Sequence, residues 1–485
     1  MLHTILATIP RDNDYPARAF TIGWRRKALD GTLYDGLAHE FHEEKNGAGE
    51  YVPLRNRRPS VKYALCRTVV SDAIALLFSE AHFPTAQCED RGVVDTLAAL
   101  VKEARLDGVM VDAALSGSVG SVAVLMRVLG GRVFFKALHT EYLTPEWKPE
   151  APDTLARVVE RYKIKGAALV DAGYSIPDDK LQAVYWFRRE WDGDAETWFL
   201  PQLASEASKA PAVDTGRTVT HSLGFVPMVW IRNLPGGDDI DGACTFAAAV
   251  ENQIEIDYQL SQAGRGLKYS SDPTLVIKEP AMDGDIVKGG GNALILAQDG
   301  DAKLLEIGGT AAAAVIEYVK VLREFALESI HGNRSSADKL SAAQSGRAIE
   351  LMNQGLIWLA DRLRASYGEH GLLPLFRMVV AAASVVELMI DGKPVTFPAG
   401  MPITLKWPRW YQPTAEDRQA DAGTLNALRA GGLMSRQTAI NALADDYDIE
   451  DVAAELLLIQ RDQAAEDARL IAVAAQTKAV EVVPS

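Results

Sequence analysis

Cysteine is scarce in this chain of 485 residues, which contains only Cys66, Cys88 and Cys244. Three cysteines at unrelated spacings provide neither a disulfide framework nor a zinc knuckle, so a reducing compartment is expected. Positive charge is also in deficit, because 50 Lys and Arg stand against 65 Asp and Glu and leave a net charge of −15. General attraction to nucleic-acid phosphates needs a basic surface, so this composition excludes non-specific coating of DNA or RNA.

Long hydrophobic runs are missing as well. The run at residues 378–386 is much shorter than the roughly 18 apolar residues that a membrane-spanning helix needs. No basic region precedes the short apolar start of the chain, so no signal peptide is predicted. Hydrophobic residues make up 48% and charged residues 24%, which is the balance of a folded protein. We expect a soluble protein made in the cytoplasm, with about three domains or one elongated subunit.

Intact catalytic motifs do not occur. His39 and His42 are three residues apart, whereas a zinc-protease helix needs four, and a solvated surface is favoured over a metal site. The glycines at 289–291 precede a predicted strand rather than a helix, and there is no Walker-type phosphate loop. The acids at 445–451 lack the glycine and the final glutamate of a calcium loop, so Asp448 is predicted to cap a helix. No catalytic residue, metal site or cofactor is predicted.

Two basic clusters, at residues 24–27 and 55–58, stand out from the acidic background. They could contact nucleic acid or the acids of a partner, or they could form a solvated face. The polar loop that carries Arg334 and Lys339 could likewise have a function, or it could simply connect two elements.

Hydrophobic periodicity predicts helices at 60–80 and 93–106, followed by a β-rich region from 132 to 231. Its clearest hairpin joins 183–191 to 195–200, and Asp192-Gly193 is expected to supply the positive φ of a tight turn. A long helix is predicted over 345–386, interrupted between Gly368 and Pro374. Further predicted elements are a strand pair turning at 391–394 and helices at 414–430, 435–444 and 449–473.

The most informative pattern is a small β module between two long helices. Asp238, Asp239 and Asp241 are expected to open the first helix, which runs to about Gly264 with one apolar side. The module at 267–309 contains three short predicted strands separated by glycine and proline. The second helix is predicted from about Thr310 to His331, so each helix would be about 36 Å long.

Four segments, taken in order, resemble portal proteins of tailed bacteriophages. Residues 116–124 and the β-region after them are similar to the wing of portals, and 229–233 with the Pro-Gly-Gly-Asp turn resembles the entry to the first stem helix. Residues 345–350 resemble the segment after the tunnel loop. Residues 407–439 resemble the portal pattern of tryptophan, helix and Ala-Gly-x-x-Ser-x-x-Thr. The likeness covers about residues 61–463, and the first 60 residues add nothing to it.

The resemblance implies an α+β, elongated and mostly helical subunit with wing, stem, clip and crown, assembling into a ring of about twelve copies around a central channel. The expected divisions are an N-terminal wing region at 1–237, a first stem helix at 238–266, a clip at 267–309, a second stem helix at 310–331, a tunnel loop at 332–344, a kinked helix with wing strands at 345–413 and a helical crown at 414–485.

Three groups of site residues are expected from this resemblance. The tunnel loop would meet DNA through Arg334, Ser335, Ser336, Asp338 and Lys339. The candidates for the channel lining are the acids Glu251, Glu255, Glu317, Glu324 and Glu328, which would repel phosphate. The clip would dock its partners through Lys278, Glu279, Asp283, Asp285 and Lys288.

The resemblance therefore predicts a phage portal protein without enzymatic activity. It would form the DNA channel at one capsid vertex of a virion, after assembly in the host cytoplasm. Its partners would be copies of itself, double-stranded DNA, the terminase large subunit during packaging, the major capsid protein and the head–tail connector, with no membrane. A ring-forming scaffold or adaptor without DNA, or an enzyme in the β-rich region, are the alternatives.

Overall fold

The computed structural model describes residues 1–206, 210–271, 274–280, 296–305, 310–332, 350–351, 353–398, 400–411, 413–444, 447, 449 and 451–481. The chain divides into two units, each of which is described by itself. The first unit comprises Met1–Arg334 and Gln354–Pro408, and the second comprises Ser335–Asn353 and Arg409–Ser485. Helices and antiparallel sheets occur together, so the α+β class is confirmed.

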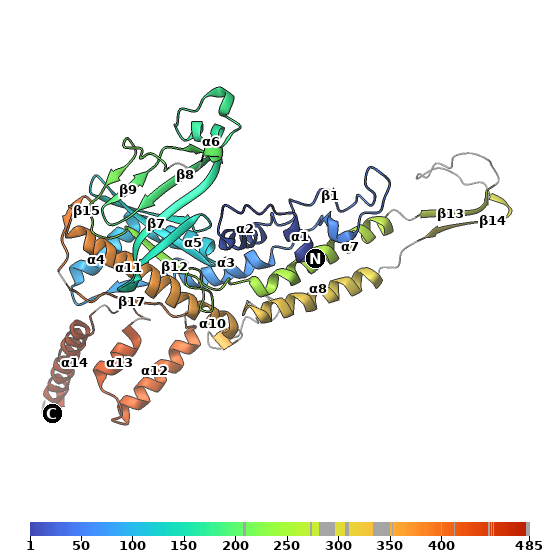
Figure 1. Cartoon of the computed structure of the whole chain (residues 1–485). Helices are drawn as coiled ribbons and strands as arrows, with labels where there is room; N and C mark the ends of the chain where they lie inside the picture. Colours follow the sequence, from blue (N-terminus) through green and yellow to red (C-terminus); the bar gives the residue numbers. More distant parts are fainter. Residues whose placement is uncertain are drawn as a thin grey trace. The chain divides into compact units, whose positions relative to one another are not determined.

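Two antiparallel sheets form the β-rich part of the first unit (Figure 1). One has the order β12-β4-β5, with bounds Met228–Arg232, Ser121–Leu129 and Arg132–His139. The other has the order β11-β9-β8-β7-β6, and β10 (Gln202–Leu203) also pairs with β8. Its strands are Val219–Thr220, Ala195–Trp198, Val184–Trp191, Ala151–Lys165 and Leu143–Lys148. Apolar residues of both sheets share one core, which includes Ala123, Val158, Trp191 and Met228.

The predicted hairpin is confirmed as β8 and β9, but its turn works differently. Gly193 is not among the glycines with positive φ. Instead, Asp192 Oδ1 accepts hydrogen bonds from the backbone N–H groups of Asp194 and Ala195, both at 2.8 Å. A Cβ at Gly193 would lie 3.2 Å from the backbone of Gly224. The glycine therefore eases a close approach between two loops.

Five helices precede the two large sheets in the chain. They are α1 (Leu2–Ala7), α2 (Ala17–Leu29), α3 (Leu65–Phe78), α4 (Arg91–Glu103) and α5 (Leu106–Gly117). The first two predicted helices are confirmed as α3 and α4, with α3 beginning at Leu65 rather than at 60. Leu65, Val69, Ala73 and Leu77 are buried along α3, as helical spacing requires.

The long helix pair consists of α7 (Val250–Ser271) and α8 (Thr310–Ser329), which lie side by side (Figure 1). Their 22 and 20 residues correspond to about 33 and 30 Å. The predicted start of the first helix is wrong, because α7 follows a 3₁₀ turn, η4 (Ala247–Ala249). Asp241 is instead buried and bonded to Arg18 and Ser121. Its partners lie far away in the chain, and they outweigh the local preference of an acid for a helix start.

Between α7 and α8, β13 (Thr274–Pro280) pairs antiparallel with β14 (Leu296–Leu305). The prediction of three short strands separated by glycine and proline is wrong over 296–305, because β14 runs through Gly300 without interruption. After α8, α10 (Gln354–Leu363), a nine-residue π-helix η6 (Arg364–Leu372) and α11 (Leu373–Ala383) form one continuous helix. The predicted interruption is therefore a π-helical segment rather than a break.

Short strands complete the first unit. The predicted strand pair is confirmed as β15 (Leu388–Ile390) and β16 (Lys393–Val395), with positive φ at Asp391 and Gly392. A third strand, β17 (Thr404–Lys406), pairs with β3 (Thr85–Gln87). A parallel pair joins β1 (His39–Glu40) to β2 (Arg57–Arg58).

The second unit contains α12 (Ala415–Ala430), α13 (Arg436–Leu443) and α14 (Val452–Glu481). Thr414 and Asp417 form a capping box at the start of α12, and Ser435 caps α13. Asp451 caps α14 by accepting hydrogen bonds from the N–H groups of Ala453 and Ala454. Asp448 itself lies outside the described residues. No residue of α12 or α13 is buried.

Candidate functional site

The helix pair of α7 and α8 is the candidate site, because it presents charged and apolar side chains on separate surfaces. One side of α7 is buried, with Val250, Ile254 and Tyr258 at helical spacing, as the sequence predicted. Tyr258 donates a hydrogen bond to the backbone oxygen of Arg57 at 2.7 Å. The N-terminal segment therefore covers this side of α7 (Figure 1).

A buried carboxylate fastens the N-terminal segment to α7. Asp257 Oδ2 accepts a 2.6 Å hydrogen bond from the Tyr34 hydroxyl, and Oδ1 accepts one of 2.5 Å from the backbone N–H of Tyr63. Burial raises the pKa of Asp257 to about 6, although both hydrogen bonds oppose this shift. Sequence reasoning missed this group, since an acid in the middle of a helix resembles any solvated acid.

The two basic clusters are largely structural. Arg57 is 1% exposed and donates to the backbone oxygen of Val52 at 2.8 Å. Arg25 donates to the backbone oxygen of Val119 at 3.1 Å, and burial lowers the pKa of the Arg26 guanidinium. Arg58 pairs with Glu40 at 2.8 Å. For Arg57, which is buried, the interpretation as a solvated face is wrong, whereas Arg25, Arg26 and Arg58 are half-buried.

α8 carries a row of exposed acids along one side. Glu317, Glu324 and Glu328 are exposed, and they are spaced seven and four residues apart. Successive residues of an α-helix rotate by about 100°, so these three side chains share one side. Val315, Val319 and Leu322 are less exposed and lie on the opposite side, toward α7. We call the three glutamates the acid row; it points away from α7.

Two further surfaces of α8 flank the acid row. Tyr318 and Phe325 are exposed on one flank, and Phe325 retains 59% of its exposable area. Ile316, Lys320 and Arg323 are exposed on the other flank, with Ile316 at 50%. Large apolar side chains at this level of exposure, repeated along one helix, are typical of a surface that another chain covers.

α7 adds a polar surface beside the aromatic flank. Its residues Glu251, Glu255, Gln259 and Gln262 are exposed or half-buried, and Gln259 donates to Glu255 at 2.7 Å. The end of α8 packs on η4, so the two helices are antiparallel. Both helices are right-handed, and they run in opposite directions. The flank of α8 that carries Tyr318 and Phe325 therefore lies on the same side of the pair as the polar surface of α7.

The pair therefore has two lateral surfaces. The acidic side is formed by Glu251, Glu255 and Gln259 of α7 with Tyr318 and Phe325 of α8, and the basic side is formed by Ile316, Lys320 and Arg323. The five acids expected to line a channel thus fall on two surfaces: three form the acid row and two belong to the acidic side.

The other expected site residues are described only in part. All five tunnel-loop residues, Arg334, Ser335, Ser336, Asp338 and Lys339, lie outside the described residues. Among the clip residues, Lys278 is exposed on β13 and Glu279 lies on the same strand. Asp283, Asp285 and Lys288 lie outside the described residues.

Segments that are far apart in the sequence meet at the π-helix. The Tyr367 hydroxyl donates to Asn233 Oδ1 at 3.0 Å, and a Cβ at Gly117 would overlap that hydroxyl. A Cβ at the next residue, Gly368, would overlap the ring of Trp407. Residues of the 116–124, 229–233 and 407–439 segments are thus brought together around η6. The glycine in the first segment was the sequence signal for this close packing.

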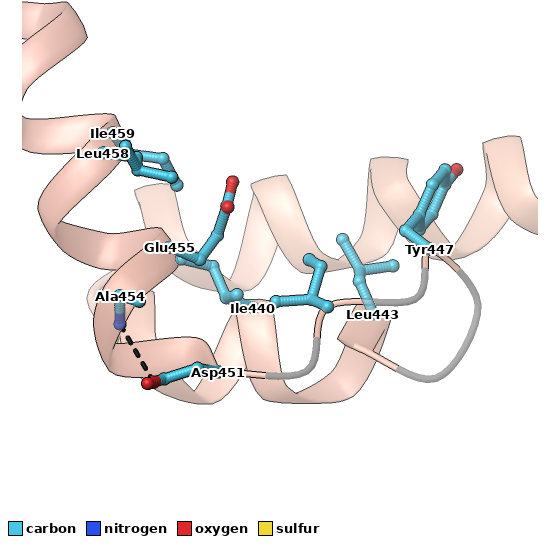
Figure 2. Close-up of a pocket in the computed structure, with 9 residues that line it drawn as sticks. Ile440, Leu443, Tyr447, Asp451, Ala454, Glu455, Leu458 and Ile459 are labelled. Carbon is cyan, nitrogen blue, oxygen red and sulfur yellow. Dashed lines mark hydrogen bonds between the residues drawn. The ribbon is translucent and has the colours of Figure 1, made fainter.

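The second unit contains an open groove between α13 and α14 (Figure 2). Its volume is about 790 Å³, and Ile440, Leu443 and Ile459 are among its apolar lining residues. Leu433, Leu457 and Leu458 are also exposed in this unit. The described residues of α12, α13 and α14 include none that is buried, so these helices form no core of their own there.

A second cavity, of about 410 Å³, lies in the first unit between β7, β12 and α11. Its lining is mainly apolar, with Trp147, Leu155 and Met378, and Arg377 and His370 are the basic groups. Within the described part of the chain, no three His, Cys, Asp or Glu side chains are placed to hold a metal ion. The helices that the structure describes include none that is both long and apolar enough to span a membrane.

No protein-family model matches the sequence, and no curated protein does. Among solved structures, the chain is similar to a chain of the virion of a native gene transfer agent (GTA) particle. The two share 14% sequence identity over 90% of this chain and 94% of that chain, with a TM-score of 0.37.

Proposed function

We propose that the protein is a portal subunit of a phage-like particle, which forms a ring around a DNA channel at one vertex. The observation that carries this proposal is the acid row of α8, which lies between two lateral surfaces suited to contact with other copies. The ordered set of four sequence segments supports the same assignment, since three of them pack around the π-helix.

A ring explains why the helix pair has exposed apolar side chains. In a closed ring each copy offers one lateral surface to the copy before it and the other to the copy after it. Ile316, Tyr318 and Phe325 would then be covered, which the lone chain does not achieve. The acid row would remain uncovered and face the axis.

The acid row suits a passage for DNA. With about twelve copies, three glutamates per copy place some 36 negative charges on the wall. Such a wall repels phosphates, so that a duplex slides without adhering. The tunnel loop, with Arg334 and Lys339, would supply a small number of weak cationic contacts.

This function needs no catalytic residue in the chain. Hydrolysis of ATP would belong to the terminase large subunit, which docks on the clip during packaging. The head–tail connector would dock there afterwards, and the major capsid protein would surround the ring. A cofactor has no role in this activity.

The test is the mass and shape of the purified full-length protein. Native mass spectrometry should give a single ring of about twelve subunits, and negative-stain images should show a central hole wide enough for a duplex. Phe325→Asp should lower the ring fraction, while the matched change Tyr51→Asp, at a side chain 65% exposed outside both lateral surfaces, should not. A compact monomer for the wild type would refute the portal assignment.

A further inference from the structure

The opposite lateral surfaces of the helix pair carry opposite charges. The acidic side has Glu251 and Glu255, and the basic side has Lys320 and Arg323. The two groups emerge on different sides of the pair, so they do not face each other within one copy. Glu251 and Glu255 are also separated from the acid row, and a role in lining a channel does not explain them.

The acids of α7 and the cations of α8 lie at matching positions along the axis of the helix pair. Because the end of α8 packs on η4, just before α7, residues near 322 of α8 lie level with Glu255. Lys320 and Arg323 are within about one turn of that level. In a ring with one rotation axis, equivalent residues of all copies have the same height, so these groups would meet a neighbour's acids without any shift along the axis.

We infer that Lys320 and Arg323 of one copy pair with Glu251 and Glu255 of the next copy, in a heterologous stem–stem contact that sets the order of copies around the ring. This rests on the proposed ring. Ile316 on the basic side then meets Tyr318 and Phe325 of the neighbour's acidic side, which buries the exposed apolar groups at the same contact. Exposed single pairs are weak, but each contact is repeated at every subunit boundary.

Charge reversal tests this inference on the full-length chain. The basic-side variant Lys320→Glu/Arg323→Glu has acids on both lateral surfaces, and the acidic-side variant Glu251→Lys/Glu255→Lys has cations on both. Each alone should lose rings by at least about tenfold at about 0.15 M salt, measured by native mass spectrometry, because like charges then meet at every boundary. The control Glu369→Lys/Glu387→Lys changes two exposed acids outside the helix pair and should assemble like the wild type.

Mixing the two reversed variants gives the decisive result. Acid-bearing and cation-bearing copies can alternate around a ring, so an equal mixture should recover rings that contain both masses in equal number. A pairing within one copy predicts the opposite, namely that the mixture stays unassembled while the variant with all four changes recovers. That outcome, or wild-type assembly of either reversed variant alone, would overturn the inference. Absence of rings in the wild type would instead refute the proposed function.

Discussion

The hydroxyl of Tyr34 donates a 2.6 Å hydrogen bond to Asp257, a carboxylate 223 residues further along the chain. This contact joins the N-terminal segment to the first helix of the candidate stem. It also places an ionisable group in a buried position, where its protonation is linked to folding.

Asp257 should make the stability of the protein depend on pH between about 4 and 6. Its pKa is raised from 3.8 to about 6 in the folded chain, so the folded state binds the proton more tightly than the unfolded state. The stabilisation is fully present below the unfolded pKa and is lost as the pH rises through about 6. The expected size is on the order of 2 to 3 kcal/mol.

The substitution Asp257→Asn removes this titration. Urea unfolding of the variant should show a flatter dependence of the unfolding free energy on pH between about 4 and 6 than the wild type shows. An unchanged dependence would mean that another group is responsible.

The ion pair of Arg18 and Asp241 should contribute far more to the free energy of unfolding than surface ion pairs do. Asp241 is buried, Arg18 Nη2 lies 2.7 Å from its Oδ1, and Arg18 also donates to the backbone oxygens of Thr140 and Leu143. Arg18→Ala leaves a buried carboxylate without its cation and should cost about 3 to 5 kcal/mol. Arg67→Ala, which removes a 3.5 Å pair with Asp30 at the surface, is the control and should cost less than about 1 kcal/mol. Equal losses in urea unfolding would contradict the prediction.

Gly117 and Tyr367 should be energetically coupled. Gly117→Ala places a methyl group against the Tyr367 hydroxyl, so the protein should be destabilised by about 1 to 3 kcal/mol. Removing that hydroxyl in the double variant with Tyr367→Phe should recover part of this loss. A double-mutant cycle measures the coupling, expected to be about 0.5 to 3 kcal/mol, and additive effects would rule it out.

The acid row should keep assembled rings from binding DNA. Glu317→Lys/Glu324→Lys/Glu328→Lys should convert rings that do not bind a duplex into rings that do, with affinity falling steeply as salt is raised. Fluorescence anisotropy with a labelled duplex gives the measurement. Glu369→Lys/Glu387→Lys, which changes exposed acids elsewhere in the first unit, is the control. Equal DNA binding by both variants would argue against a special role for this row.

Local patterns predicted the elements whose partners lie nearby. The spacing of Val69, Ala73 and Leu77 placed α3, and Asp391-Gly392 placed the turn between β15 and β16. The second long helix was predicted from about Thr310, where α8 begins. In these cases the period of burial or the φ of a turn is decided by a few neighbouring residues.

Long-range partners explain what the sequence did not reveal. The acids at 238–241 have the composition of a helix start. However, Asp241 forms an ion pair with Arg18, and the helix begins at Val250. Arg57 resembled a surface cation in the sequence. In the structure it is buried, and its guanidinium donates a hydrogen bond to the backbone oxygen of Val52. The sequence named five acids as candidates for a channel lining without separating them. Their division into the acid row and the acidic side required knowledge of which side of α8 faces α7.

The N-terminal segment has a consequence for the order in which the chain is made. Tyr34 and Arg18 leave the ribosome long before the residues that receive them, which follow 223 positions later in both cases. At a synthesis rate of about 5 to 20 residues per second, this delay is about 10 to 45 s. The two contacts that fasten the N-terminal segment therefore form only after the chain has been made as far as Asp241 and Asp257.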